Sequence, residues 1–323
     1  MTTGLVFGKF MPVHTGHLAL IDFAVKQCDR LIVSMSYMPD DPIAPERRLA
    51  WLTELLAPYP TIELVAELDD FHDPTLPLYE ATRLWAVFIK RRFPEVKVFF
   101  TSEEYGIPLA HHSGLRHVSF DPARQHVPVS ATLIRQHPFQ YWSYIPEAVR
   151  PYFVKKICLY GPESVGKTTM ARQLAAEYET FFVAEVARDL ITTNDFTIDD
   201  IIRIGYAQTK AVQEAERRAN RVLFCDTDVI TTQIYSDIYL HEIPPVLYDL
   251  ERQVTYDAYV LLDIDVPWVA DGLRDLGERR AEMFALFRHA LAQRGQFYTL
   301  VSGSFPERLA KIRGITDQLL AKN

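Results

Sequence analysis

The segment Lys155–Thr169 places a glycine-containing loop between a predicted strand and a predicted helix, and it constrains the fold more than any other stretch. Ile157–Tyr160 is an apolar run of strand length, and Met170–Tyr178 continues as a helix. The connecting GPESVGKT fits the pattern G-x-x-x-x-G-K-[ST]. Gly161 and Gly166 allow backbone torsions that a side chain would block, so successive N–H groups can point at phosphate oxygens. The spacing therefore predicts a P-loop.

The loop residues are expected to bind ATP. Lys167 supplies a positive charge to the β- and γ-phosphates, and the Thr168 hydroxyl binds Mg²⁺. The alternative is an ordinary strand-to-helix turn with an exposed lysine. The four fixed positions arise by chance in roughly one chain in a hundred of this length, and the flanking elements lower that figure. We therefore favour phosphate binding, with the predicted ATP-contacting residues Gly161, Glu163, Ser164, Val165, Gly166, Lys167, Thr168 and Thr169.

The position of the loop divides the chain. A P-loop usually follows the first strand of its domain, so the residues before it form a second domain, as a length of 323 residues also suggests. We expect a first domain at 1–145, a hinge at 146–155 rich in aromatic residues and proline, and a second domain at 156–323.

Composition limits the classes of function. A hydrophobic content of 48% and a charged content of 24% are typical of a globular protein. The net charge of −8 argues against broad nucleic-acid binding, and no apolar run is long enough to span a membrane. Without a signal-peptide pattern, and with Cys28, Cys158 and Cys225 expected to be reduced, the sequence predicts a cytoplasmic protein. A homo-oligomer stays open.

The first domain begins with a second strand–turn–helix unit. Leu5–Phe7 is a short apolar strand, and GKFMPVHTGH follows it. Near a helix N-terminus, His14 and His17 can converge on one phosphate, with Gly8, Lys9 and Phe10 completing the cradle. A zinc pair would need further ligands, and none is nearby. The pattern resembles the nucleotidyltransferase superfamily with its H-x-G-H signature, and a chance match arises on the order of once in 10⁵ chains.

The superfamily's second signature is a helix start rich in serine and threonine, and SATLIR matches it. Ser130 is predicted to cap this helix, while Thr132 and Arg135 face the β- and γ-phosphates. In this superfamily no side chain acts as a nucleophile. The resemblance implies an enzyme that holds the nucleophile in line with the α-phosphate of ATP and stabilises the developing charge.

Between the two signatures, strands and helices alternate, which favours parallel strands with crossover helices. Arg48 is expected to reach the substrate, although a solvated helix face fits equally well. Asp69 and Asp70 follow the third strand and are expected to bind nucleotide or pyridine; a polar turn is the alternative. Thr101 ends the fourth strand and is expected to touch adenosine. The predicted strands are Leu31–Met35, Thr61–Ala66, Val96–Thr101 and Arg116–Phe120, and the predicted helices are Pro45–Leu56 and Leu78–Phe93.

The second domain is also predicted to alternate strands and helices. Val222–Asp226 is an apolar strand that ends in an acid, the Walker B form, so Asp226 is expected to help hold Mg²⁺. Asp228 is expected to contact ribose or position the attacking hydroxyl, and a helix N-cap is the alternative. Arg274 is expected to lie in a lid over the transferred phosphoryl group, and a solvated charged helix is the alternative. Further predictions are a strand at Thr180–Val183, a capping box at Thr197–Asp200 that opens a helix ending near Arg218, strands at Tyr259–Leu262 and Tyr298–Val301, and a C-terminal helix.

The whole chain resembles the NadR family, bifunctional nicotinamide-mononucleotide adenylyltransferases and ribosylnicotinamide kinases. The resemblance rests on GKFMPVHTGH, SATLIR, FQYWSYIPEAVRPYF, GPESVGKT, DTDVITTQ and WVADGLR. It implies two doubly wound α/β domains and two linked reactions. The second half phosphorylates nicotinamide riboside with ATP and Mg²⁺, and the first half joins the mononucleotide to AMP, giving NAD and pyrophosphate. The direct participants expected are His14, His17, Arg135, Lys167, Asp226 and Asp228.

Some family members carry an N-terminal helix-turn-helix and repress transcription. This chain starts at its first predicted strand, so no repressor function is expected. Two other interpretations stay open: a different adenylyltransferase–kinase pair, and a nucleotide sensor without turnover. The intact His14, His17, Lys167 and Asp226 argue against the sensor.

Overall fold

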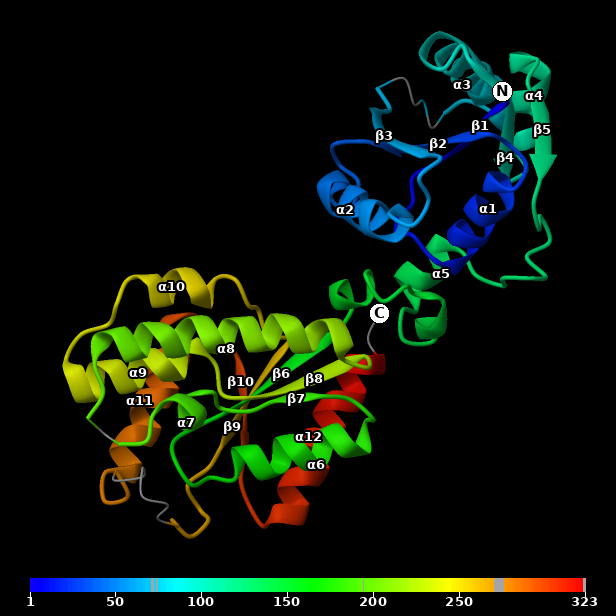
Figure 1. Ribbon diagram of the computed structural model, residues 1–323. Helices are drawn as coiled ribbons and strands as arrows, with labels where there is room; N and C mark the ends of the chain where they lie inside the picture. The colour runs from blue at the N-terminus through cyan, green and yellow to red at the C-terminus, as the bar shows by residue number, and fades with distance from the viewer. Residues whose placement is uncertain (71–72, 74, 194, 270–275, 322–323) are drawn as a thin grey trace. The chain divides into compact units, whose positions relative to one another are not determined.

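The computed structural model describes residues 1–70, 73, 75–193, 195–269 and 276–321, and the chain divides into two compact units. The N-terminal unit is Met1–Arg150, and the C-terminal unit is Pro151–Lys322. Each unit contains one five-stranded, fully parallel sheet with helices on both faces (Figure 1). The prediction of two doubly wound α/β units is confirmed. Within the described residues, no helix combines the length and apolarity needed to cross a membrane.

The sheet of the N-terminal unit has the strand order β3-β2-β1-β4-β5. Leucine, isoleucine and phenylalanine side chains on one face pack against α3 and α4, while α1 and α2 lie on the other face (Figure 1). The strands are β1 (Thr3–Gly8), β2 (Arg30–Tyr37), β3 (Ile62–Leu68), β4 (Val96–Thr101) and β5 (Arg116–Ser119). The helices are α1 (Thr15–Val25), α2 (Pro45–Leu56), α3 (Leu78–Arg92), α4 (Gly106–Ser113) and α5 (Ala131–Gln136), followed by a 3₁₀ turn at Trp142–Tyr144.

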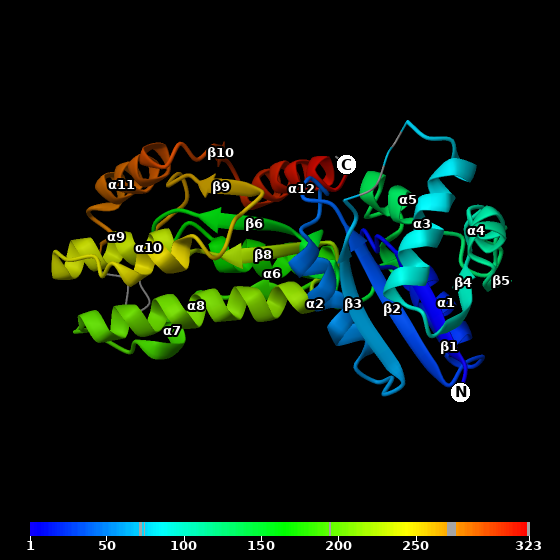
Figure 2. The same cartoon turned by 90° about the horizontal axis from the view of Figure 1, so that it is seen from above.

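The sheet of the C-terminal unit has the order β10-β9-β6-β8-β7, and β9, β6 and β8 lie side by side in the view from above (Figure 2). Helices α6 and α12 cover one face, and α9 and α11 cover the other. The strands are β6 (Lys155–Tyr160), β7 (Phe182–Val183), β8 (Val222–Asp226), β9 (Ala258–Leu262) and β10 (Tyr298–Val301). The helices are α6 (Lys167–Glu177), α7 (Ala187–Leu190), α8 (Ile198–Arg218), α9 (Val229–Leu240), α10 (Val246–Glu251), α11 (Arg280–Gln293) and α12 (Phe305–Ala321), with a 3₁₀ turn at Arg150–Tyr152.

Proline and capping signals in the sequence correctly predicted the boundaries of two helices. Helix α2 spans the predicted range, and α8 begins at the predicted capping box, in which the Thr197 side chain accepts from the Asp200 N–H and the Asp200 side chain accepts from the Thr197 N–H. Strand β7 is shorter than predicted because only Phe182 and Val183 pair with β8. Helices α4, α7, α10 and α11 were not predicted.

Candidate active sites

A cavity of about 450 Å³ opens in the N-terminal unit at the carboxyl ends of β1 and β4, where the strand order reverses. Open parallel sheets bind their ligands at this position. Both nucleotidyltransferase-like signatures line this one cavity, although they lie more than a hundred residues apart in the chain. The predicted residues along its wall are Gly8, Lys9, Phe10, His14, His17, Thr101, Ser130, Thr132 and Arg135.

The two histidines of the first signature form the N-terminal cap of α1. His14 Nδ1 accepts from the Gly16 N–H at 3.1 Å, and His17 Nδ1 accepts from the His14 N–H at 3.2 Å. Burial, with a smaller contribution from Arg124, lowers the pKa of His14 to about 3. Burial and the two neighbours His14 and Arg124 also lower the pKa of His17 well below its usual range. Both rings are therefore neutral, and since each Nδ1 accepts, each ring carries its proton on Nε2.

The second signature contacts the first through Arg135. The predicted cap of α5 is confirmed, because Ser130 Oγ accepts from the Leu133 N–H at 3.2 Å. Arg135 donates to the Met11 carbonyl and, at 3.2 Å, to Thr132 Oγ1. The bond to Met11 ties α5 to the turn between β1 and α1, while the bond to Thr132 stays within α5. The residues of the two signatures therefore face the same cavity.

Arg48 lies behind the cavity and not on its wall, which corrects both the expectation that it reaches the substrate and the alternative of a solvated helix face. The side chain is fully buried and donates to the Lys9 carbonyl at 2.7 Å and to Asp41 Oδ2 at 2.8 Å. Asp41 also receives the Lys9 ammonium at 3.3 Å. Arg48 therefore supports the Gly8–Phe10 turn from the core side.

The two aspartates after β3 differ in position. Asp69 is buried and lines a smaller cavity of about 250 Å³ together with Phe7, Trp85 and Tyr105, whereas Asp70 is exposed. The ring centroid of Phe7 lies 5.3 Å from that of Trp85 and 5.3 Å from that of Tyr105. Sequence reasoning missed these aromatic residues, because they come from three different elements.

Arg124 was also missed. It lines the larger cavity, donates to the Val129 carbonyl and to Glu103 Oε1, both at 2.8 Å, and adds positive charge beside the two histidines. The four-residue turn that presents it, Asp121 to Arg124, carries no recognised motif. A cation near neutral histidines favours an anionic ligand.

In the C-terminal unit the P-loop connects β6 to α6, as predicted. Gly161 and Gly166 have φ values of +135° and +93°, conformations that L-residues rarely adopt. The Lys167 ammonium donates to the carbonyls of Gly161 and Pro162 at 2.9 and 3.0 Å. Lys167 and Glu163 line a cavity of about 110 Å³.

Thr168 and Asp226 fit the predicted magnesium site. The Thr168 hydroxyl donates to Asp226 Oδ2, and Asp226 Oδ1 is buried with no hydrogen-bond partner among the described residues. Burial raises the pKa of Asp226 to about 6, an effect that Lys167 opposes. A carboxylate oxygen left without a donor beside a threonine hydroxyl suits a hard cation that takes its other ligands from phosphate and water.

Asp228 occupies the alternative position, the N-cap of α9, which corrects the expectation that it faces the substrate. Its Oδ1 accepts from the Thr231 N–H at 3.0 Å, and its Oδ2 accepts from the Tyr259 hydroxyl at 2.8 Å. The carboxyl is almost completely buried and does not line the P-loop cavity. Burial raises its pKa to about 6.

The rest of the P-loop cavity comes from residues that the sequence did not single out. Gln208 is buried on α8; its Oε1 accepts from the Val186 N–H at 2.9 Å, and its Nε2 has no partner among the described residues. Glu185 pairs with Arg188 at 3.0 Å. An E-x-x-R segment directly after a strand was the available signal for these two. The cavity wall further includes Phe196, Thr227, Thr231, Thr232, Tyr235 and Tyr239.

Arg274, the predicted lid arginine, lies outside the described residues. Of the arginines that follow it, Arg279 pairs with Glu282 at 2.7 Å, and Arg280 donates to the carbonyls of Val266 and Ser164 at 2.5 and 3.3 Å. Arg280 thus contacts the P-loop backbone.

Comparison with known proteins finds relatives that match nearly the whole chain. Residues 156–308 match the family model described as an AAA domain. The Escherichia coli (strain K12) "Trifunctional NAD biosynthesis/regulator protein NadR" is 34% identical over 302 residues, which cover 85% of this chain and 72% of that protein. A "Nicotinamide-nucleotide adenylyltransferase" from Methanospirillum hungatei JF-1 is 28% identical over 145 residues, covering 42% of this chain and 75% of that enzyme.

Two solved structures share the fold. A crystal structure of a NadR protein in complex with NR has a TM-score of 0.83 at 21% identity and covers 100% of this chain and 97% of that one. A second, in complex with NAD and AMP-PNP, has a TM-score of 0.81 at 22% identity with the same coverage.

Proposed function

The chain belongs to the NadR family, and from that premise we propose that it is a bifunctional enzyme of NAD salvage. Its C-terminal unit transfers a phosphoryl group from ATP to nicotinamide riboside, and its N-terminal unit joins the resulting mononucleotide to AMP from a second ATP, releasing pyrophosphate. The observation that carries the proposal is a pair of sites whose donors suit phosphate, one built on His14, His17 and Arg135 and the other on Lys167 and Thr168.

In the kinase unit, the P-loop N–H groups and Lys167 bind the β- and γ-phosphates. Thr168 and Asp226 would hold Mg²⁺, which when bound neutralises charge on the phosphates. Glu185 lines the same cavity and lies close enough to raise the pKa of Asp226, so we assign it to the 5′-hydroxyl, where it accepts the proton as the phosphorus–oxygen bond forms.

The riboside fits the remainder of that cavity. The unpartnered Nε2–H of Gln208 is a donor for a ribose hydroxyl or the carboxamide oxygen. Phe196, Tyr235 and Tyr239 supply aromatic surface for the pyridine ring, with the Phe196 and Tyr239 centroids 5.2 Å apart. A positively charged pyridinium is well matched to aromatic faces.

In the adenylyltransferase unit, the Nε2–H groups of His14 and His17 donate to ATP phosphate oxygens, with Lys9, Thr132 and Arg135 adding charge and donors. The smaller cavity beside Phe7 and Trp85 shares Gly8 and Lys9 with the larger one, so we assign the nicotinamide end of the mononucleotide to it. Its phosphate then lies near the α-phosphate of ATP and attacks in line.

Mass spectrometry of the products from nicotinamide riboside, ATP and Mg²⁺ tests the proposal. The wild type gives NAD, Lys167→Ala gives NAD only when the mononucleotide is supplied, and His17→Ala accumulates the mononucleotide. Lys210→Ala and His111→Ala change an exposed lysine and an exposed histidine and serve as controls. Failure of the wild type to consume the riboside, or loss of both steps in one site variant with the fold retained, overturns the assignment.

A further inference from the structure

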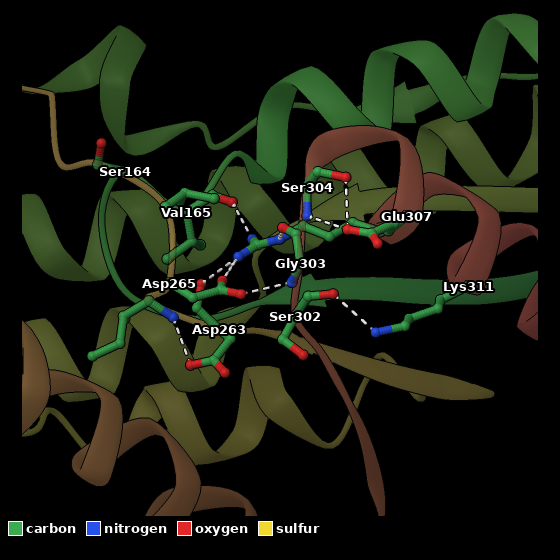
Figure 3. Close-up of polar contacts among 12 residues, drawn as sticks. Ser164, Val165, Asp263, Asp265, Ser302, Gly303, Ser304, Glu307 and Lys311 are labelled. Carbon is green, nitrogen blue, oxygen red and sulfur yellow. Dashed lines mark hydrogen bonds and ion pairs between the residues drawn. The ribbon is translucent and has the colours of Figure 1, made fainter.

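A fully buried arginine lies beneath the P-loop, outside the residues that line its cavity. Arg308 is on α12, near the start of the helix, and its side chain is completely enclosed. Its Nε donates to the Gly303 carbonyl at 2.8 Å, its Nη1 to the Val165 carbonyl at 3.1 Å, and its Nη2 to the Asp263 carbonyl at 3.1 Å and to Asp265 Oδ1. Figure 3 shows Val165, Asp263, Asp265 and Gly303 arranged around these bonds.

These contacts join three segments that are far apart in the sequence. Val165 belongs to the P-loop, Asp263 and Asp265 follow β9, and Gly303 follows β10. Asp265 strengthens the junction, because its Oδ2 accepts from the Gly303 N–H at 2.6 Å. Burying a guanidinium is costly unless its donors are satisfied, and here each nitrogen of the group donates to an oxygen. A surface position would avoid that cost, so the buried placement calls for a role.

The peptide geometry of the loop suggests that role. In a loop that turns successive N–H groups toward a phosphate, the carbonyls of those peptides point outward and need other partners. Arginines supply them at two successive residues: Arg280 donates to the Ser164 carbonyl at 3.3 Å, and Arg308 donates to that of Val165. Helix α12 adds a packing contact, since a Cβ placed on Gly166 would meet the Phe305 ring at 3.0 Å.

We propose that Arg308 is a positioning residue for the kinase reaction. By holding the Val165 carbonyl outward and fixing it to the ends of β9 and β10, it keeps the P-loop N–H groups turned toward the triphosphate before ATP arrives. The inference rests on the proposed binding of ATP by this loop. Without Arg308, part of the binding free energy of ATP goes into ordering the loop, and the affinity falls.

The test measures ATP binding and kinase kinetics in full-length protein. A His17→Ala background removes the proposed ATP site of the other unit. In it, ATP affinity is compared by titration calorimetry among the parent, Arg308→Gln, Arg308→Lys and Asp265→Asn. Arg313→Gln is the matched control: it lies on the same helix, and its ion pair with Glu177 at 2.6 Å is exposed. Kinase KM values for ATP and riboside are measured beside the melting temperature.

In Arg308→Gln we expect the dissociation constant and the KM for ATP to rise about tenfold. A change of this size corresponds to the loss of one buried charge-assisted interaction. The riboside KM stays within about twofold, as expected for a change confined to the phosphate side. Arg308→Lys recovers part of the loss, and Asp265→Asn shows a smaller loss in the same direction. Asp265 is partly exposed, so its variant keeps the test informative if Arg308→Gln does not fold.

A lowered melting temperature with unchanged ATP affinity in the folded variants makes Arg308 purely structural and overturns the inference. An equal loss of ATP affinity in Arg313→Gln does so as well. If the parent binds ATP but does not phosphorylate the riboside, only the substrate assignment fails. If it shows no ATP binding that Lys167→Ala abolishes, the proposed P-loop site itself fails.

Discussion

The imidazole rings of His14 and His17 stack with their centroids 3.8 Å apart, while each ring accepts a hydrogen bond from backbone at the start of α1. Two protonated rings at this separation would repel, and neither could accept at Nδ1. The two rings are therefore neutral, and each leaves an uncharged Nε2–H donor for the proposed phosphate contact.

We expect the N-terminal unit to lose stability in mild acid. The folded-state pKa of His14, about 3, is below the ordinary histidine value of 6.5, so below pH 6.5 the unfolded chain binds protons that the folded chain does not. The loss grows by up to about 1.4 kcal/mol per pH unit for each such histidine. His14→Asn, which retains an acceptor for the Gly16 N–H, should show a shallower decline of melting temperature between pH 7 and pH 5. The control is His111→Asn, and an unchanged slope in His14→Asn would contradict the assignment.

Asp226→Asn should separate stability from activity in the kinase unit. The folded-state pKa of about 6 lies above the ordinary aspartate value of 3.8, so the ionised carboxylate costs stability above pH 6, and that cost fades as the pH falls through 6. At pH 8 we expect the variant to melt no lower than wild type, yet to lose roughly 10²-fold or more in kinase kcat and its response to Mg²⁺. Calorimetry and a magnesium titration of the rate check this. A fall in melting temperature with normal kinetics would assign Asp226 to the fold.

For Asp228 we expect the opposite pattern. Asp228→Ala removes the cap of α9 and leaves the buried Tyr259 hydroxyl without its acceptor, a combined cost of about 2 kcal/mol. Asp228→Asn keeps an acceptor for the cap and should cost less. Urea unfolding measures both, and the riboside KM and kcat should stay within a few-fold of wild type. A selective rise in riboside KM in Asp228→Asn at unchanged stability would return this residue to the substrate site.

A fragment ending at Arg150 should fold alone, since the residues of the proposed adenylyltransferase site all lie within the first compact unit. We expect cooperative thermal unfolding and an ATP-dependent rise in its melting temperature that His17→Ala removes. Aggregation of the fragment, while the full chain stays in solution, would mean that the two units share a core.

The sequence predicted those parts of the sites that a short segment defines. Gly161, Gly166 and Lys167 belong to one turn whose geometry follows from spacing alone, and Ser130 and Thr197 sit where local capping rules place them. It did not predict Glu185 or Gln208. Periodicity shows that a side chain on α8 is buried, but only tertiary packing decides that Gln208 is buried beside the P-loop cavity.

Two residues, Asp228 and Arg48, could not be placed from local sequence rules alone. A cap and a substrate ligand both call for an acid at Asp228, and the contact with Tyr259, on a strand 31 residues away, decides between them. Arg48 resembles any arginine on an amphipathic helix until its buried partner Asp41 is known.

The cap of α1 also bears on how such a chain can change over evolutionary time. Each imidazole of the H-x-G-H segment accepts a backbone hydrogen bond at the helix start with Nδ1 and leaves Nε2 for the proposed ligand contact. A mutation at either position therefore affects two properties at once. The replacement must accept a hydrogen bond from the backbone and must also donate one to the proposed phosphate. Few side chains meet both requirements. A variant that meets only one of them loses either the proposed ligand contact or the cap of the helix.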